Sequence, residues 1–169
     1  MMKGHIFLIG FMGCGKSTVA RCLARSLSLP CSDTDAMIEQ KAGMTISEIF
    51  EKKGEPAFRE METRLLRDLK DKAPMVISCG GGMAMRPENA ALMKAAGTVV
   101  LIKASPETIL ERVIRNDNRP LLRGRKDIAS ISALMEERRE RYEAAADFCV
   151  VTDNDHRADT VAEEIIKKI

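Results

Sequence analysis

A glycine-rich stretch near the beginning of the chain constrains the fold more than any other feature of the sequence. Residues 10–18 read Gly-Phe-Met-Gly-Cys-Gly-Lys-Ser-Thr and match the pattern G-x-x-x-x-G-K-[ST] at every fixed position. The apolar run Ile6–Ile9 comes directly before this stretch, and apolar residues at helical spacing follow it, beginning with Val19 and Ala20. A strand, a phosphate-binding loop and an amphipathic helix are therefore expected in this order.

Each residue type in this loop has a physical role in binding phosphate. Glycines let the backbone curl into a nest whose N–H groups point at a β-phosphate, and the following helix adds the positive end of its dipole. We expect Lys16 to bridge the β- and γ-phosphate oxygens and the Ser17 hydroxyl to ligate Mg²⁺. The predicted nucleoside triphosphate site comprises Gly13, Cys14, Gly15, Lys16, Ser17 and Thr18.

Further short segments have the composition of buried strands. Met75–Ser78, Val99–Ile102 and Phe148–Val151 are almost continuously apolar, and Pro30–Ser32, ending at Asp33, is a weaker candidate. Continuous rather than alternating apolarity indicates strands that are covered on both faces, as in a parallel sheet. Because segments with helical spacing separate these runs, the sequence predicts a three-layer α/β/α fold with a five-stranded parallel sheet flanked by helices.

Size and composition bound the class of protein. The chain has 169 residues, and since a typical domain has about 150, residues 1–169 are expected to form a single domain. Apolar residues make up 45% and charged residues 31% of the chain, which is typical of a soluble globule. The apolar runs fall far short of the roughly 20 residues of a membrane span, and the first residues carry no secretory cleavage pattern. We therefore expect a cytoplasmic protein that does not cross a membrane.

Charge and cysteine content exclude several partners. The 27 basic and 25 acidic residues are interspersed and leave a net charge of only +2, so nucleic acid is not an expected partner. The five cysteines never form Cys-x-x-Cys and there are only two histidines, so a zinc site would lack ligands at metal spacing. Small molecules remain as the expected partners, and nothing in the sequence requires more than a monomer.

Two acidic residues follow the second predicted strand. Asp33 and Asp35 are separated by one threonine, and ligands of open α/β sheets gather beyond the carboxyl ends of the strands. Asp33 could hold Mg²⁺ through water, while Asp35 could accept a hydrogen bond from an alcohol and orient it for attack. The alternative is that Asp33 caps the next helix and Asp35 is an acid of its first turn. The sequence leaves both interpretations open.

Two other segments suggest an acceptor site. Arg59 beside Phe58 could bind a small carboxylate through two parallel hydrogen bonds while the phenyl ring covers an apolar face, although a surface arginine is the simpler interpretation. Gly80–Gly82 follows a buried strand, where three glycines weaken any regular structure. They indicate that a ligand touches bare backbone, and an ordinary turn is the alternative.

Helix signals delimit a basic loop in the second half of the chain. Thr45–Glu48 is a capping box, and Ser105 followed by proline begins a helix that should stop near Asn116. Residues 116–127 then combine turn formers with four arginine or lysine side chains. A loop of this length in so short a chain is more often functional than a plain connection, and we predict that it is a mobile lid.

The order of these features resembles the shikimate kinase family over nearly the whole chain. The matching features are residues 10–18, Asp33 with Asp35, Gly43 with residues 46–50, Gly54 and Glu55 with Phe58, Arg59 and Glu62, Gly80–Gly82, residues 118–122, and Arg138 four residues before Tyr142. The resemblance implies transfer of the γ-phosphoryl group of ATP to the 3-hydroxyl of shikimate, with Mg²⁺ required, in chorismate and aromatic amino acid biosynthesis.

The resemblance also implies roles for particular residues. Residues 34–62 would form a helical segment that binds shikimate, with Asp35 on the hydroxyls as a candidate base and Phe50 and Phe58 lining the pocket. Arg59 and Arg138 would clamp the carboxylate, and the backbone of Gly80, Gly81 and Gly82 would complete the pocket. Arg119 would be a lid arginine that reaches the phosphates, and Arg112 would lie against adenine. Asp155 departs from the family, whose members often carry a basic residue near adenine.

Two other classes of function share the loop. Gluconate kinases and nucleoside monophosphate kinases use the same loop and a closing lid. A monophosphate acceptor needs several convergent arginines, whereas Asp33, Asp35 and the triple glycine suit a neutral polyol with one acid group. A non-catalytic nucleotide sensor would keep Lys16 and lack an acceptor pocket.

Overall fold

The computed structural model describes residues 4–115, 127–153 and 156–169. The strands are β1 (His5–Ile9), β2 (Cys31–Asp33), β3 (Val76–Ser78), β4 (Gly97–Lys103) and β5 (Phe148–Val151). The helices are α1 (Lys16–Leu27), α2 (Thr34–Ala42), α3 (Ile46–Leu69), α4 (Pro87–Ala96), α5 (Pro106–Ile114), α6 (Ile128–Ala145) and α7 (Ala158–Lys168), with a 3-10 turn η1 at Met83–Met85. The strand predictions are therefore confirmed to within two residues at their ends.

All strands pair in parallel in one sheet of order β2-β3-β1-β4-β5. Central β1 places Phe7 opposite Ile77 of β3 and Val99 of β4, and every residue of β1 is buried. Because the strands are parallel, their carboxyl ends share one edge, where Asp33 and Ser78 lie as partners in the register of β2 and β3. The five-stranded parallel sheet is confirmed.

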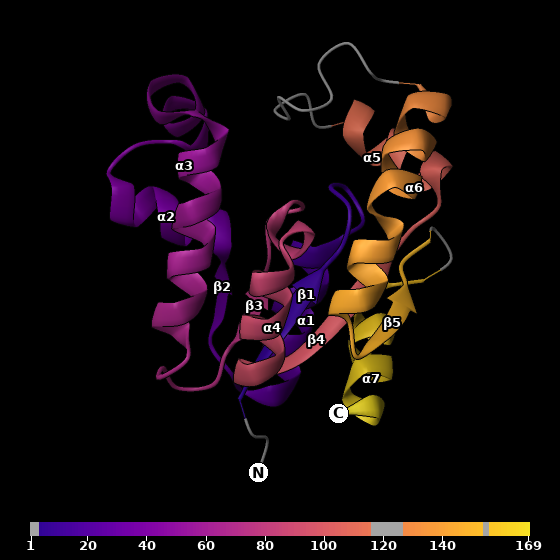
Figure 1. Cartoon of the computed structure of the whole chain (residues 1–169). Helices are drawn as coiled ribbons and strands as arrows, with labels where there is room; N and C mark the ends of the chain where they lie inside the picture. Colours follow the sequence, from indigo (N-terminus) through magenta and orange to yellow (C-terminus); the bar gives the residue numbers. More distant parts are fainter. Residues whose placement is uncertain (1–3, 116–126, 154–155) are drawn as a thin grey trace.

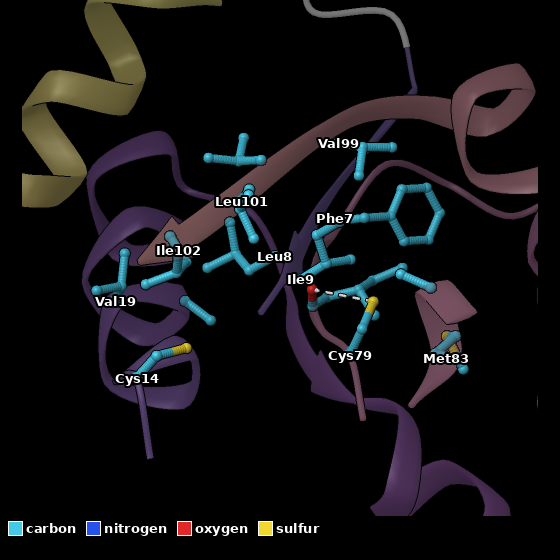
Figure 2. Close-up of a cluster of buried hydrophobic side chains, with 14 of the residues drawn as sticks. Phe7, Leu8, Ile9, Cys14, Val19, Cys79, Met83, Val99, Leu101 and Ile102 are labelled. Atoms are coloured by element: carbon cyan, nitrogen blue, oxygen red, sulfur yellow. Dashed lines mark hydrogen bonds between the residues drawn. The ribbon is translucent and has the colours of Figure 1, made fainter. Parts of the chain in front are cut away.

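Helices cover both faces of this sheet (Figure 1). Helix α1 packs with α7 behind the sheet, whereas α4 lies in front and contacts α3 and α6. Figure 2 shows the core between the layers, with Leu8 and Ile102 near Val19 of α1 and with Cys79 near Met83 of η1. This is the predicted three-layer arrangement, and no helix of the described residues is long and apolar enough to span a membrane.

The predicted helix starts are present as hydrogen bonds. At the start of α3, Glu48 N donates to Thr45 Oγ1 at 3.2 Å and Thr45 N donates to Glu48 Oε2 at 2.8 Å, so the capping box is complete. The donation from the Thr45 backbone lowers the pKa of Glu48. Ser105 Oγ accepts from Thr108 N at 3.2 Å at the start of α5, which ends at Ile114, close to the predicted stop.

Helix α3 is interrupted inside its length at Gly54. Gly54 has φ 81° and ψ 166°, so the backbone leaves the helical conformation there and a new helical turn begins around Pro56. The break lets the two halves of α3 meet at an angle and brings the rings of Phe50 and Phe58 to 5.0 Å between centroids. Both rings then face the same cleft.

Most of the predicted lid lies outside the described residues. They end at Arg115 and resume at Asp127, so Arg119 and residues 116–126 have no structural description, and Asp155 is also outside. At the last position of the predicted lid, Asp127 caps α6, because its Oδ1 accepts from Ser130 N at 2.8 Å. Mobility of the lid stays a prediction.

Candidate active site

The loop between β1 and α1 shows why its pattern contains glycine. Gly13 and Gly15 have φ angles of 78° and 95°, a region that residues with a Cβ rarely adopt. At Gly15 there is also little space, because a Cβ would lie 3.3 Å from Arg112 Nη1 and 3.6 Å from Thr152 Oγ1. The loop is therefore packed against protein on its outer side, while its inner side lines a large cleft.

The loop residues place a positive charge and a helix end at this cleft. Lys16 is 9% exposed, and its Nζ donates to the carbonyl oxygens of Gly10 at 2.7 Å and Phe11 at 3.0 Å. Helix α1 has no side-chain cap and no acidic residue in its first turn. Its first N–H groups are therefore available to an anion at the positive end of the helix dipole. Ser17 Oγ lies 3.3 Å from Ser78 Oγ at the end of β3.

A cleft of about 1190 Å³ opens beyond the carboxyl edge of the sheet. It brings together most of the residues that the sequence singled out, namely Gly13, Gly15, Lys16, Ser17, Thr18, Asp33, Asp35, Phe50, Phe58, Arg59, Gly80, Gly81, Gly82, Arg112 and Arg138. Cys14 does not line it, because its fully buried side chain faces a separate cavity of about 320 Å³. Any contact of Cys14 with a phosphate would therefore come from its backbone.

At the end of β2 the structure shows the capping arrangement for Asp33. Its Oδ1 accepts from Asp35 N at 3.0 Å and from Ala36 N at 3.3 Å, which starts α2. Between the two acids, Thr34 Oγ1 accepts from Gly80 N at 2.9 Å and ties α2 to the glycine segment. Sequence reasoning missed Thr34, which is fully buried and carries no signal of its own.

Asp35 is half-buried and lines the cleft. Its Oδ1 has no hydrogen-bond partner among the described residues. Burial, and next the negative charge of Asp33, raise its pKa to about 6, although Lys16 and Arg59 act in the opposite direction. A carboxyl with this pKa is largely ionised at neutral pH and still binds a proton readily.

A second buried acid, Glu62, stands beside the predicted clamp. Its Oε2 accepts from Arg59 Nη1 at 2.9 Å, and Arg59 Nη2 also binds Glu55 at 3.1 Å. The Glu62 side chain is 1% exposed, and burial raises its pKa to about 7 against the lowering effect of Arg59. The sequence pattern contained Glu62 but gave it no role. Its position three residues after Arg59 on a helix was the available signal.

The glycine segment lets these side chains approach the end of β3. A Cβ at Gly80 would lie 2.8 Å from Asp35 Oδ1 and 3.3 Å from Glu62 Oε1, and a Cβ at Gly82 would overlap the guanidinium of Arg59. Bare backbone was predicted to serve a ligand. At these two glycines it accommodates side chains of the protein itself, and at all three it also lines the cleft.

The second predicted clamp arginine, Arg138, lies on α6. Figure 1 shows α6 across the molecule from α3, which carries Arg59. The Arg138 guanidinium carbon lies 5.8 Å from the ring centroid of Phe11, and its buried Nη1 has no hydrogen-bond partner among the described residues. One turn later, the Tyr142 hydroxyl donates to the carbonyl oxygen of Gly81. Burial raises the pKa of Tyr142 to about 12, so the hydroxyl stays a donor. Tyr142 was quoted from the sequence without a role.

Arg112 lines the cleft beside the phosphate loop. Its Nη1 donates to Gly13 O at 3.3 Å and to Thr152 Oγ1 at 3.4 Å, and its Nη2 donates to Thr152 O. The guanidinium is thus hydrogen-bonded to the backbone of the phosphate loop while the residue also lines the cleft. Contact with adenine stays a prediction.

The cleft combines acceptors and a donor that the protein leaves without partners. Asp35 Oδ1, Glu62 Oε1 and Arg138 Nη1 are all buried, lack hydrogen bonds within the described chain and belong to residues that line the cleft. Buried polar atoms are nearly always paired, and an unpaired one costs about 1–3 kcal/mol. The cleft is therefore suited to a ligand that brings both hydroxyl donors and an anionic acceptor.

Comparison with known proteins decides the family. The family model described as "Shikimate kinase" matches residues 12–169. The chain belongs to the shikimate kinase family. The shikimate kinase of Moorella thermoacetica is 43% identical over 164 residues, which cover 97% of this chain and 93% of that protein.

Solved structures agree with this membership. A shikimate kinase of Acinetobacter baumannii in complex with shikimate has a TM-score of 0.90 and 36% identity, covering 98% of this chain and 92% of that one. A gluconokinase from Sinorhizobium meliloti has a TM-score of 0.58 and 17% identity, covering 98% of this chain and 91% of that one, which is a similarity of fold alone. The family resemblance found in the sequence is confirmed.

Proposed function

We propose that this chain transfers the γ-phosphoryl group of ATP to the 3-hydroxyl of shikimate, giving shikimate 3-phosphate and ADP on the route to chorismate. The observation that carries the proposal is the cleft in which a phosphate loop faces unpaired buried groups, Asp35 Oδ1, Glu62 Oε1 and Arg138 Nη1. Shikimate is a small ring with three hydroxyls and one carboxylate, and it matches this set of acceptors and donor.

The acceptor side of the cleft supports a specific orientation of the ring. Arg59 on α3 and Arg138 on α6 flank the glycine segment, so they suit the carboxylate with charge-assisted hydrogen bonds. Asp35 then suits the hydroxyls at the end nearer the phosphate loop, since Lys16 is close enough to affect its pKa. Phe50 and Phe58 line the cleft and provide apolar contact for the ring.

The loop side supports nucleotide binding. The phosphates would occupy the nest of Gly13, Cys14 and Gly15 and the first turn of α1, which includes Thr18. Lys16 would exchange the carbonyls of Gly10 and Phe11 for phosphate oxygens. As the resemblance to the family implies, Arg112 would contact adenine and Arg119 of the lid would reach the phosphates.

The oxygen donors beside the loop fit Mg²⁺. Ser17 Oγ and Ser78 Oγ lie 3.3 Å apart, and the carboxylate of Asp33 is on the neighbouring strand end. Hydroxyl and carboxylate oxygens are the ligands that Mg²⁺ prefers, with water completing its shell. Ser17 would bind the ion directly and Asp33 through water, leaving Asp33 Oδ1 to cap α2. The bound ion would neutralise charge on the phosphates.

Asp35 is the candidate base for the acceptor hydroxyl. Its pKa of about 6 leaves it ionised at neutral pH, so it can accept the proton of the 3-hydroxyl as the phosphoryl group is transferred. Because the transition state of phosphoryl transfer is loose, orientation and charge stabilisation contribute more than deprotonation. Asp35 would therefore act as much by orienting the hydroxyl as by binding its proton.

A parallel substrate assay tests the proposal. Release of ADP from MgATP is measured with shikimate, gluconate and AMP as acceptors, and turnover is expected with shikimate alone. Turnover with gluconate or AMP would favour the other kinases of this fold, and nucleotide binding without turnover on any acceptor would favour a sensor. All proposed contacts come from one chain, so we expect the activity from a monomer, in the cytoplasm where ATP is available.

A further inference from the structure

Thr152 contacts the phosphate loop from the side opposite the cleft. It follows the last residue of β5 and is 3% exposed. Its backbone N–H donates to Lys103 O at 2.8 Å, which fixes it to the end of β4, and its Oγ1 donates to the carbonyl oxygen of Cys14. The hydroxyl thus ties the loop between β1 and α1 to the carboxyl end of β5, the edge strand of the sheet.

Arg112, which lines the cleft, and Thr152, which does not, together bind the backbone of the loop. Arg112 Nη1 lies 3.4 Å from Thr152 Oγ1 and 3.3 Å from Gly13 O, so the two side chains bind consecutive carbonyls of the loop. Thr152 Oγ1 is also 3.6 Å from where a Cβ of Gly15 would lie. The loop is therefore held at this place by hydrogen bonds to two consecutive carbonyls.

The geometry of the peptide bond gives this contact a consequence inside the cleft. In a trans peptide the carbonyl oxygen and the following N–H point in opposite directions. Because Thr152 binds the carbonyl of Cys14 on the outer side, the N–H of Gly15 is directed to the inner side, where Gly15 and Lys16 line the cleft.

We infer that Thr152 is a positioning residue for nucleotide binding, which holds the Gly15 N–H toward the β-phosphate by binding the Cys14 carbonyl. The inference rests on the proposed function, since it assumes that the loop binds a nucleotide. Donors that are fixed before the ligand arrives need no reorganisation on binding, and a hydrogen bond to a charged group is roughly twice as strong as a neutral one. Loss of the hydroxyl is therefore expected to weaken nucleotide binding about tenfold.

The test compares T152V, which replaces the hydroxyl with a methyl group, with T152S, which keeps the hydroxyl. Titration calorimetry measures the Kd of ADP with Mg²⁺ and, separately, the Kd of shikimate. T152V is expected to bind ADP about tenfold more weakly and shikimate unchanged, and T152S is expected to bind both within about twofold of the wild type. In turnover, the KM for ATP should rise in T152V while the KM for shikimate does not.

T108V is the matched control. Thr108 is also 3% exposed, but its hydroxyl binds Ser105 Oγ at 3.0 Å in the first turn of α5 and does not contact the loop. The T108V variant should have a lower melting temperature than the wild type, and the ratio of its Kd for ADP to its Kd for shikimate should be unchanged. If T152V did not fold, T152A would take its place in the same titrations.

The remaining outcomes contradict the inference. They are unchanged ADP binding in T152V, equal weakening of ADP and shikimate, or an effect of T152S as large as that of T152V. Failure of both T152V and T152A to fold would show a structural role and would also contradict it. A wild-type protein that bound neither ligand would instead contradict the proposed function.

Discussion

The two halves of the cleft differ in how their polar groups are balanced. On the phosphate side, Lys16 binds two loop carbonyls, and Arg112 and Thr152 bind two others. On the acceptor side, Asp35, Glu62 and Arg138 each retain a buried polar atom that has no partner in the part of the chain that the structure describes. The phosphate side is thus fixed by hydrogen bonds from side chains to its backbone, whereas the acceptor side holds polar atoms that a ligand could satisfy.

This difference predicts where a substitution acts. A change on the phosphate side removes contacts that exist in the free protein, so it should affect nucleotide binding and catalysis together. A change on the acceptor side alters groups that the free protein holds at a cost, so it should affect shikimate binding and the dependence of stability on pH.

The largest effect is expected from K16A. This substitution removes the ammonium group that the phosphate loop provides. Turnover should fall about a thousandfold or more and ATP should bind more weakly, because charge on the transferred phosphoryl group is no longer stabilised. Steady-state kinetics and calorimetry check this, and shikimate binding should stay measurable. K52A, which changes an exposed lysine on α3, is the control. Normal turnover in K16A would remove the phosphate-loop assignment.

D35N should cause the next largest loss. Without a group that accepts the hydroxyl proton, kcat should fall about a hundredfold or more, while ATP binding changes little. In the wild type, kcat/KM for shikimate should decrease as the pH is lowered through about 6, because the base becomes protonated. A profile that is flat between pH 5 and 8 would show that Asp35 is not the base, and a fully active D35N would show that it neither orients nor deprotonates the acceptor.

R138A sharpens the comparison between the two sides. Half of the carboxylate clamp is lost, so the KM for shikimate should rise roughly thirtyfold while the KM for ATP stays close to normal. The neighbouring R139A, which removes an exposed side chain paired with Glu136 and Glu143, is the matched control and should change neither value. An effect of R138A confined to the KM for ATP would show that Arg138 acts on the phosphate side of the cleft and would contradict its assignment to the carboxylate clamp.

The smallest expected effect concerns stability. The folded-state pKa values of Asp35 and Glu62, about 6 and about 7, lie above their usual values, so the folded state binds more protons than the unfolded state in this range. The free energy of unfolding should therefore fall as the pH rises from about 4 to about 7, and shikimate should oppose the fall. E62Q should reduce the slope, measured by urea denaturation at several pH values. A stability that rises over this range would contradict the raised pKa values of these two acids.

Local patterns were sufficient for much of the fold. The capping box at Thr45 and the cap at Ser105 depend on residues three positions apart, and the structure shows both. The five strands were predicted because buried parallel strands must be apolar on both faces. At Asp33 the sequence offered two interpretations, and the structure shows the cap, because the N–H groups of Asp35 and Ala36, two and three residues later, donate to its carboxylate.

Other parts of the site could not be predicted, because their roles arise from contacts between distant segments. Thr34, Tyr142 and Thr152 are ordinary hydroxyl residues in the sequence, and only the fold brings them to Gly80, Gly81 and Cys14. Nor does the sequence show that Asp35 and Glu62 lie near the same glycine. Burial at that place, which only the fold creates, raises the pKa of both carboxyls.

The sequence by itself determined the phosphate loop, the parallel sheet and the family, because these depend on residue types at fixed short spacings. Only the tertiary structure decided which buried polar atoms lack a hydrogen-bond partner among the described residues and which side chains bind the carbonyls of the phosphate loop. The physical reason is that desolvation and hydrogen bonding depend on what surrounds an atom in space. For Arg59, Arg138 and Thr152, those surroundings come from strands and helices far away along the chain.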